Sequence, residues 1–126
     1  MNYGHFTSID KNRIIYENDL VVGFFDAYPI AEGHSLVIPK NSVKTIFDLA
    51  IEEQQAVWSA VQETRNILSD LFNPDAFNIG INDGLAAGQT IQHAHIHIIP
   101  RYQGDKSDPR GGIRWIFPNK AKYWDD

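Results

Sequence analysis

The chain has 126 residues, which is enough to bury one hydrophobic core and short for two domains. With 43% hydrophobic and 21% charged residues, its composition is typical of a globular protein rather than a disordered one. It contains no cysteine, which excludes zinc ribbons, thiol catalysis and disulfide scaffolds. The net charge of −5 argues against broad nucleic-acid binding, which requires a basic face.

Basic residues concentrate towards the C-terminus. Six of the 11 Lys and Arg residues but only four of the 16 acidic residues follow residue 100, so this part carries +2 and the first 100 residues carry −7. The apolar stretches are far shorter than a bilayer span, and the polar first residues are unlike a signal peptide. We therefore expect a cytoplasmic protein with a basic loop and tail over residues 103–126 that can contact phosphates on a small ligand.

The first third of the chain predicts three strands. Residues 13–17 and 20–25 are rich in Ile, Val, Tyr and Phe, and Asn18-Asp19 between them is typical of a turn, so the two segments predict a hairpin. Residues 34–39 predict a third strand that ends at Pro39, because proline cannot donate a hydrogen bond to a neighbouring strand.

A long helix and two more strands follow. Apolar residues recur at three- and four-residue steps from about residue 52 until Asn73-Pro74 ends the helix, and a short helical turn is expected at 45–49. Residues 76–81 and 91–99 predict strands, joined by a Gly-rich segment. Most links between strands are too short for helical crossovers. We therefore expect an α+β fold, a single domain over residues 1–126 with an antiparallel sheet of about five strands, one long helix and a short helix.

Three of the five histidines alternate in His93-Ala94-His95-Ile96-His97. Alternate side chains of a strand share one face, so the three imidazoles are expected together and the apolar residues between them on the opposite face. The plainest explanation is three polar residues on the wet face of a half-buried strand. Strict alternation of three histidines instead favours chemistry, either metal binding or nucleophilic catalysis.

A metal site would use two of these histidines. At about 3.3 Å per residue, His93 and His97 lie roughly 13 Å apart along a strand, too far for all three to bind one ion. Further ligands would come from His34, His5 or a carboxylate. A metal-binding protein is therefore one alternative, of a different functional class.

Nucleophilic catalysis by imidazole is the other chemical interpretation. A neutral imidazole is a good phosphorus nucleophile near pH 7, and a hydrogen bond from its second nitrogen to a carbonyl would orient the attacking nitrogen. Donors around the phosphoryl oxygens would stabilise the charge that builds up in the transition state.

The residues around the histidines resemble a known family. Segment 88–101, Gly-Gln-Thr-Ile-Gln-His-Ala-His-Ile-His-Ile-Ile-Pro-Arg, resembles the signature of the histidine triad (HIT) superfamily, in which three histidines alternate with apolar residues after Gly-Gln-(Ser/Thr). Segments 25–29 and 33–39 resemble the family's second and third strands. The likeness runs from about residue 14 to residue 101 in the family's order.

The resemblance implies a homodimeric nucleotide hydrolase or transferase that acts at the α-phosphate of a nucleotide conjugate. His95 matches the family nucleophile, which forms a nucleotidyl-histidine intermediate that water resolves. His93 and His97 match the residues that fix its tautomer and bind phosphate oxygens. The other matches are an additional histidine, His34; residues at the phosphate or the leaving atom, Gln89 and Thr90; a substrate-holding amide, Asn82; a ribose-binding residue, Asp26; and apolar residues beside the base, Phe6 and Ile9.

The chain departs from some relatives at both ends. It lacks the N-terminal cysteine pair with which some bacterial members bind zinc, so no cofactor is expected, and magnesium would enter only as an ion bound to the substrate's phosphates. Segment 108–118 resembles the tail of one group of bacterial members. We expect Arg110 and Arg114 to bind distal phosphates and Trp115 to pack on the core or on a neighbouring subunit.

These expectations rank the substrates. Dinucleoside polyphosphates such as diadenosine tetraphosphate come first, because the basic tail can receive additional phosphates. Nucleoside phosphoramidates are the alternative, and a catalytically idle nucleotide-binding protein is a third hypothesis.

Overall fold

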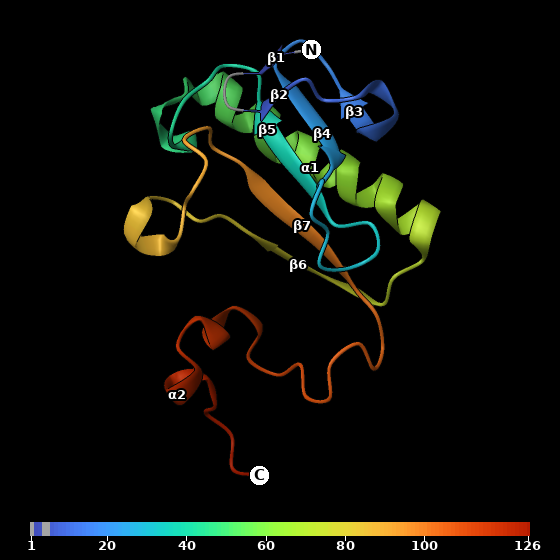
Figure 1. Cartoon of the computed structure of the whole chain (residues 1–126), viewed down its shortest axis with the longest axis vertical. Helices are drawn as coiled ribbons and strands as arrows, with labels where there is room; N and C mark the ends of the chain where they lie inside the picture. Colours follow the sequence, from blue (N-terminus) through green and yellow to red (C-terminus); the bar gives the residue numbers. More distant parts are fainter. Residues whose placement is uncertain (1, 4–5) are drawn as a thin grey trace.

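The computed structural model describes residues 2–3 and 6–126. Its centre is an antiparallel sheet with the strand order β3-β4-β5-β7-β6 (Figure 1). The strands are β3 (Ile14–Glu17), β4 (Val21–Phe25), β5 (Ser35–Pro39), β6 (Ala76–Gly80) and β7 (Ile96–Arg101). The sequence prediction of an α+β fold with about five antiparallel strands, one long helix and a short helix is confirmed.

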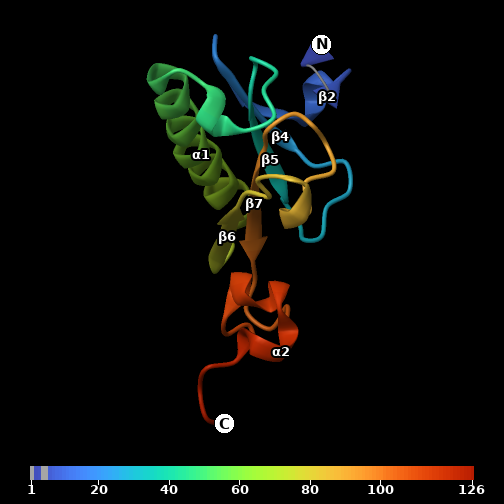
Figure 2. The same cartoon turned by 90° about the vertical axis from the view of Figure 1, so that its left-hand side faces the viewer.

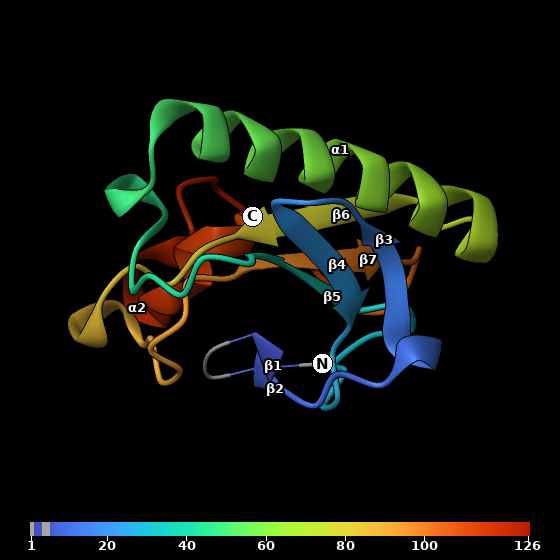
Figure 3. The ribbon, with the colours of Figure 1, turned by 90° about the horizontal axis from the view of Figure 1, so that it is seen from above.

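The long helix α1 (Ile51–Phe72) covers one face of the sheet (Figure 3). Glu52 and Glu53 lie in its first turn, where negative charge interacts favourably with the helix dipole. The helix ends at Asn73, which adopts a left-handed conformation with φ of 50°, directly before Pro74. Residues spaced three and four apart turn towards the sheet and are buried: Val57, Ala60, Val61, Thr64 and Leu68.

Strand β4 contributes side chains to the apolar clusters on both faces of the sheet. Val21 belongs to the core beneath α1, whereas Val22 and Phe24 belong to a second apolar cluster on the opposite face. Between them, Gly23 lies so close to α1 that a β-carbon at this position would collide with Thr64 Oγ1. Glycine therefore sets how closely the helix approaches the sheet.

A short N-terminal hairpin covers the face opposite α1 (Figures 2 and 3). Its strands are β1 (Asn2–Tyr3) and β2 (Phe6–Thr7), and sequence analysis predicted neither, because two-residue strands have no detectable periodicity. The buried Ile9 belongs to the second apolar cluster, and Phe6 packs against it. This face carries the residues on which the functional prediction depends.

Strand β7 begins at Ile96, five residues later than predicted. The residues before it do not extend the sheet, because the Ala94 N–H donates to the carbonyl of Val43, in the segment after β5, at 2.8 Å. The prediction that His93 and His95 stand on this strand is therefore wrong. Only His97 does, with Leu36 of β5 opposite it on one side and Gly80 of β6 on the other.

After β7 the chain leaves the sheet and forms a separate lobe (Figure 1). The lobe contains the predicted polar loop, a 3₁₀ helix η4 (Gly112–Ile116) and a short helix α2 (Pro118–Ala121). The other 3₁₀ helices are η1 (Lys11–Arg13), η2 (Ile46–Asp48), at the predicted helical turn, and η3 (Leu85–Ala87). Among the helices of the described residues, none is both long and apolar enough to cross a membrane.

Candidate functional site

A cavity of about 630 Å³ lies beside the start of β7, on the face opposite α1. We call it the histidine cavity. It gathers predicted site residues from four separate segments of the chain: the N-terminus, the end of β4, the Gly-rich loop after β6, and the histidine segment. Seven of the twelve predicted residues line it: Phe6, Ile9, Asp26, Asn82, Thr90, His95 and His97.

The backbone defines the tautomer of His95. Its Nδ1 lies 2.8 Å from the carbonyl oxygen of His93, and because a carbonyl only accepts, Nδ1 carries the proton and donates. Neutral His95 therefore presents an unprotonated Nε2. Within the described chain no group hydrogen-bonds to Nε2, and the imidazole, 8% exposed, lines the cavity. This nitrogen has the lone pair that a phosphorus nucleophile needs.

His93 lies beneath the cavity and does not line it. Its side chain is fully buried, and Nε2 donates to the carbonyl oxygen of Pro39 at 2.7 Å. This bond ties the histidine segment to the end of β5, and the His93 carbonyl in turn orients His95. His93 thus positions the central histidine through its backbone.

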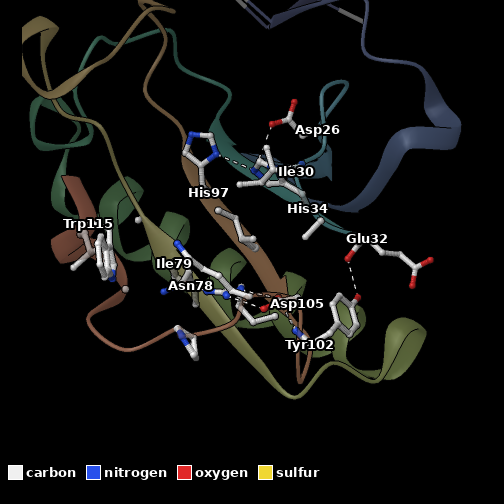
Figure 4. Close-up of a pocket in the computed structure, with 18 of the residues that line it drawn as sticks. Asp26, Ile30, Glu32, His34, Asn78, Ile79, His97, Tyr102, Asp105 and Trp115 are labelled. Carbon is white, nitrogen blue, oxygen red and sulfur yellow. Dashed lines mark hydrogen bonds and ion pairs between the residues drawn. The ribbon is translucent and has the colours of Figure 1, made fainter. Parts of the chain in front are cut away.

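His34 and His97 form a directed hydrogen-bond chain (Figure 4). The Ile30 N–H donates to His34 Nδ1 at 3.2 Å, so neutral His34 carries its proton on Nε2. That Nε2 lies 3.0 Å from His97 Nδ1 and donates to it. The remaining proton of neutral His97 is therefore on Nε2, where it can donate to a ligand in the cavity.

Burial favours the neutral form of both His34 and His97. It lowers the pKa of His34 below 6.5, and the nearby Asp26 carboxylate only partly offsets the effect. Burial lowers the pKa of His97 as well, and repulsion from His95 and His34 adds to the decrease. Asp26 Oδ2 lies 3.4 Å from His34 Nε2, and Oδ1 accepts from the Tyr28 N–H.

The apolar end of the histidine cavity is built around Phe6. Its ring contacts those of His95 and Phe24, with centroids 5.3 and 5.6 Å apart. Phe24, Leu36 and Arg13 also line the cavity, and sequence analysis did not identify them as site residues. Strand alternation predicts Phe24 and Leu36 to be inward-facing, but no sequence signal singles out Arg13, whose Nε and Nη2 donate to the Phe25 carbonyl.

Gln89 holds the shape of the Gly-rich loop. Its carboxamide accepts from the Gly84 N–H and donates to the carbonyls of Lys44 and Ile91, all within 3.0 Å, and only 5% of the residue is exposed. The amide is thus engaged by backbone, while the adjacent Thr90 lines the cavity. A contact between Gln89 and phosphate stays a prediction.

The structure places the two predicted tail arginines away from the histidine cavity. Arg110 forms ion pairs with Asp108 and Asp126, and Arg114 donates to the carbonyls of Lys120 and Ala121. Neither residue lines the histidine cavity. Both guanidinium groups hold the C-terminal lobe together, and binding of distal phosphates by them stays a prediction.

The donor atoms of Asp26, His34 and His97 lie within 4.8 Å of one another, the arrangement in the described residues that most resembles a metal site. Two nitrogens that bind one tetrahedral zinc lie about 3.3 Å apart, given metal–nitrogen bonds of about 2.0 Å. The 3.0 Å between His34 and His97 is a hydrogen-bond distance, so the pair would have to separate to hold an ion. His5, another predicted ligand, lies outside the described residues.

Comparison with known proteins places the sequence in a family. The profile of the HIT domain family matches residues 8–104. The asymmetrical bis(5'-nucleosyl)-tetraphosphatase of Schizosaccharomyces pombe is 38% identical over 77% of this chain and 53% of its own length. The bis(5'-adenosyl)-triphosphatase of Dictyostelium discoideum is 37% identical over 77% of this chain and 65% of its own length.

A solved structure supports the same assignment. The diadenosine triphosphate hydrolase of Plasmodium falciparum, solved in complex with cyclomarin A, superposes with a TM-score of 0.74 at 37% identity, covering 79% of this chain and 68% of that one. The match of the family profile to more than half of the sequence, together with the shared fold, shows that this chain belongs to the HIT domain family.

Proposed function

We propose that this protein hydrolyses nucleotide conjugates at the α-phosphate through a covalent intermediate on His95. One observation carries the proposal: the His93 carbonyl holds the proton on His95 Nδ1 and leaves Nε2 unprotonated at the wall of the histidine cavity. An unprotonated ring nitrogen at the wall of a cavity is the group that nucleophilic attack on a bound phosphate requires.

The chemistry proceeds in two displacements. His95 Nε2 attacks the α-phosphorus, a nitrogen–phosphorus bond forms, and the bond from phosphorus to the leaving group breaks. Water then attacks the phosphorus of the nucleotidyl-histidine, the nitrogen–phosphorus bond breaks, and the nucleoside monophosphate and one proton from the water are released, which restores neutral His95. His97 Nε2–H donates to the reacting phosphate, with its orientation set by His34, and so stabilises the charge that develops there.

The histidine cavity suits a nucleoside monophosphate. Phe6 and Ile9 provide an apolar end for a base, and Asp26 provides a carboxylate that can accept from ribose hydroxyls. Asn82 and Thr90 add polar groups near the histidines. The relatives named as dinucleoside polyphosphate hydrolases support dinucleoside polyphosphates as the first substrate class. Nucleoside phosphoramidates are the alternative.

The test compares wild type with His95→Ala on diadenosine tetraphosphate and adenosine 5'-phosphoramidate. We expect turnover to fall by at least a thousandfold while nucleotide binding and thermal stability are retained, because the covalent route is removed. His95→Gly with added imidazole is the matched control, and it should regain part of the turnover. Substantial activity in His95→Ala would refute the nucleophile.

The cluster of Asp26, His34 and His97 supports a second candidate, a metal-binding protein. The primary proposal needs no cofactor, with magnesium acting only on the substrate's phosphates. Zinc titration of chelator-treated protein followed by calorimetry separates the two. Stoichiometric zinc that survives dialysis and is required for turnover would favour the metal site.

We also propose that the protein acts as a homodimer in the cytosol. Strand β6 lies at an edge of the sheet with Ile79 41% exposed, and an unpaired edge is a template for strand pairing. Light scattering after size-exclusion chromatography gives the oligomeric state, and fractionation of cells gives the compartment. A monomer at micromolar concentration would refute the dimer.

A further inference from the structure

Arg13 brings a permanent positive charge to the apolar end of the histidine cavity. The segment between β2 and β3 runs along the face opposite α1 and ends in η1, whose last residue is Arg13 (Figure 3). The register of β3 against β4 places Ile14 opposite Phe24, so the preceding Arg13 reaches the backbone of Phe25. Of the described residues that line the cavity, Arg13 is the one Lys or Arg.

Two contacts fix the guanidinium of Arg13. Its Nε and Nη2 donate to the Phe25 carbonyl at 3.1 and 3.0 Å. The guanidinium carbon lies 5.6 Å from the centre of the Phe24 ring, which in turn contacts Phe6. Phe6 is the ring that contacts His95. Arg13 therefore belongs to the end of the cavity that suits a base, with two aromatic rings between it and the nucleophile.

The remaining donors of Arg13 have no partner within the described residues. A guanidinium has five N–H groups in one plane, and the Phe25 carbonyl accepts from two of them. Among the others, one on Nη1 and one on Nη2 point the same way and form a parallel pair at the end of the side chain. The carboxylate of the cavity, Asp26, accepts from the Tyr28 N–H and lies beside His34. The parallel pair is therefore available to a ligand that offers two acceptors side by side.

A guanine base offers two such acceptors. Its O6 and N7 lie on one edge and both accept, whereas the same edge of adenine has N7 beside the N6 amine, which donates. An arginine binds the guanine edge through two parallel hydrogen bonds, but the adenine amine would face an N–H of the guanidinium. We propose that Arg13 binds this edge of the base, so that the histidine cavity prefers guanosine conjugates to adenosine conjugates. The inference rests on the proposed function in that a nucleoside monophosphate occupies the cavity.

Calorimetry of wild type with four nucleoside monophosphates tests the ligand side. We expect GMP and IMP to bind about tenfold more tightly than AMP, because both present O6 and N7. The 7-deaza analogue of GMP, which lacks N7, should lose most of this advantage. IMP lacks the 2-amino group of guanine and so shows whether O6 and N7 suffice. Equal affinities for GMP and AMP, or an IMP that binds no better than AMP, would overturn the proposal.

The variant Arg13→Lys tests the protein side, with Arg65→Lys as the matched control. Lysine keeps the charge and a donor for the Phe25 carbonyl but has no parallel pair of N–H groups. Arg65 also lies over a phenylalanine ring, 4.8 Å from the centre of Phe77, but does not line the cavity. We expect the ratio of the Kd values for AMP and GMP to fall from about ten to about two in Arg13→Lys and to stay unchanged in Arg65→Lys.

This ratio is insensitive to partial unfolding, which lowers the binding-competent fraction equally for both ligands. An unchanged ratio in Arg13→Lys would overturn the proposal. An equal loss of affinity for AMP, GMP and ribose 5-phosphate would overturn it as well, because the guanidinium would then bind phosphate rather than the base.

Turnover separates this inference from the proposed mechanism. For wild type, kcat/KM is measured on guanosine 5'-phosphoramidate and adenosine 5'-phosphoramidate, and we expect about a tenfold preference for the guanosine compound. If neither compound is turned over while GMP binds more tightly than AMP, the catalytic proposal fails and the base preference stands. If turnover depends on His95 but is equal for the two compounds, and GMP and AMP bind equally, the base preference fails and the mechanism stands.

Discussion

Acidification should destabilise this protein through the His34–His97 pair. Both groups have pKa values lowered below 6.5 in the folded state, chiefly by burial. As the pH falls below 6.5, the unfolded chain binds these protons first, so acid favours unfolding. The loss of stability begins near pH 6.5, continues down to the folded-state pKa values and then levels off.

The size of the effect follows from the number of protons. One proton taken up on unfolding changes the free energy of unfolding by about 1.4 kcal/mol per pH unit, so the pair contributes at most about 2.7 kcal/mol per unit. Urea denaturation of chelator-treated protein at half-unit steps from pH 7.5 to 5.0 measures the slope. Salt should alter it little, because screening acts mainly on exposed charges.

Two variants test whether the pH dependence of the unfolding free energy comes from His34 and His97. His34→Gln and His97→Gln each remove one titrating group while keeping a polar side chain. Each should lower the slope of the unfolding free energy against pH by up to about 1.4 kcal/mol per unit, the contribution of one proton. The other three histidines are present in both variants and in wild type, so the three slopes are compared with the same remaining histidines in place. A slope that both variants retain in full, or a protein that becomes more stable towards pH 5.5, would refute the lowered pKa values of the buried His34–His97 pair.

Three further outcomes follow from the packing and the site. Gly23→Ala should lower the free energy of unfolding by about 1–3 kcal/mol through its collision with Thr64, and Thr64→Ala should relieve most of that loss in a double-mutant cycle; additive losses would contradict the close approach. Asp26→Ala should raise KM about tenfold for a ribonucleotide conjugate and far less for its 2',3'-dideoxy analogue, and an equal rise for both would exclude ribose binding. Gln89→Leu should cost about 1–3 kcal/mol of stability in thermal and urea melts, because three backbone groups lose their partner.

Local patterning was sufficient to predict the frame of the fold. The three- and four-residue spacing of apolar residues predicted α1, and Asn73-Pro74 predicted its end, because a left-handed residue followed by proline cannot continue a helix. The sheet strands were predictable for the same reason: alternation and turn residues act over a few positions. The histidine motif made His95 the candidate nucleophile, and the residues around it suggested the family that the comparison confirmed.

Contacts between segments far apart in the sequence decided the start of β7 and the surroundings of the predicted site residues. Alternation placed His93 on a strand, but the bonds of this segment to Pro39 and Val43, more than 50 positions away, turn it inward and start β7 later. Similarly, the charge of the tail suggested a phosphate contact through Arg110, whereas in the folded chain Asp108 and Asp126 form ion pairs with its guanidinium group. The sequence determined which local elements form and which chemistry is present, because both depend on neighbouring residues. The tertiary structure decided which of those groups meet, because burial and hydrogen bonding across the sheet depend on residues far apart in the chain.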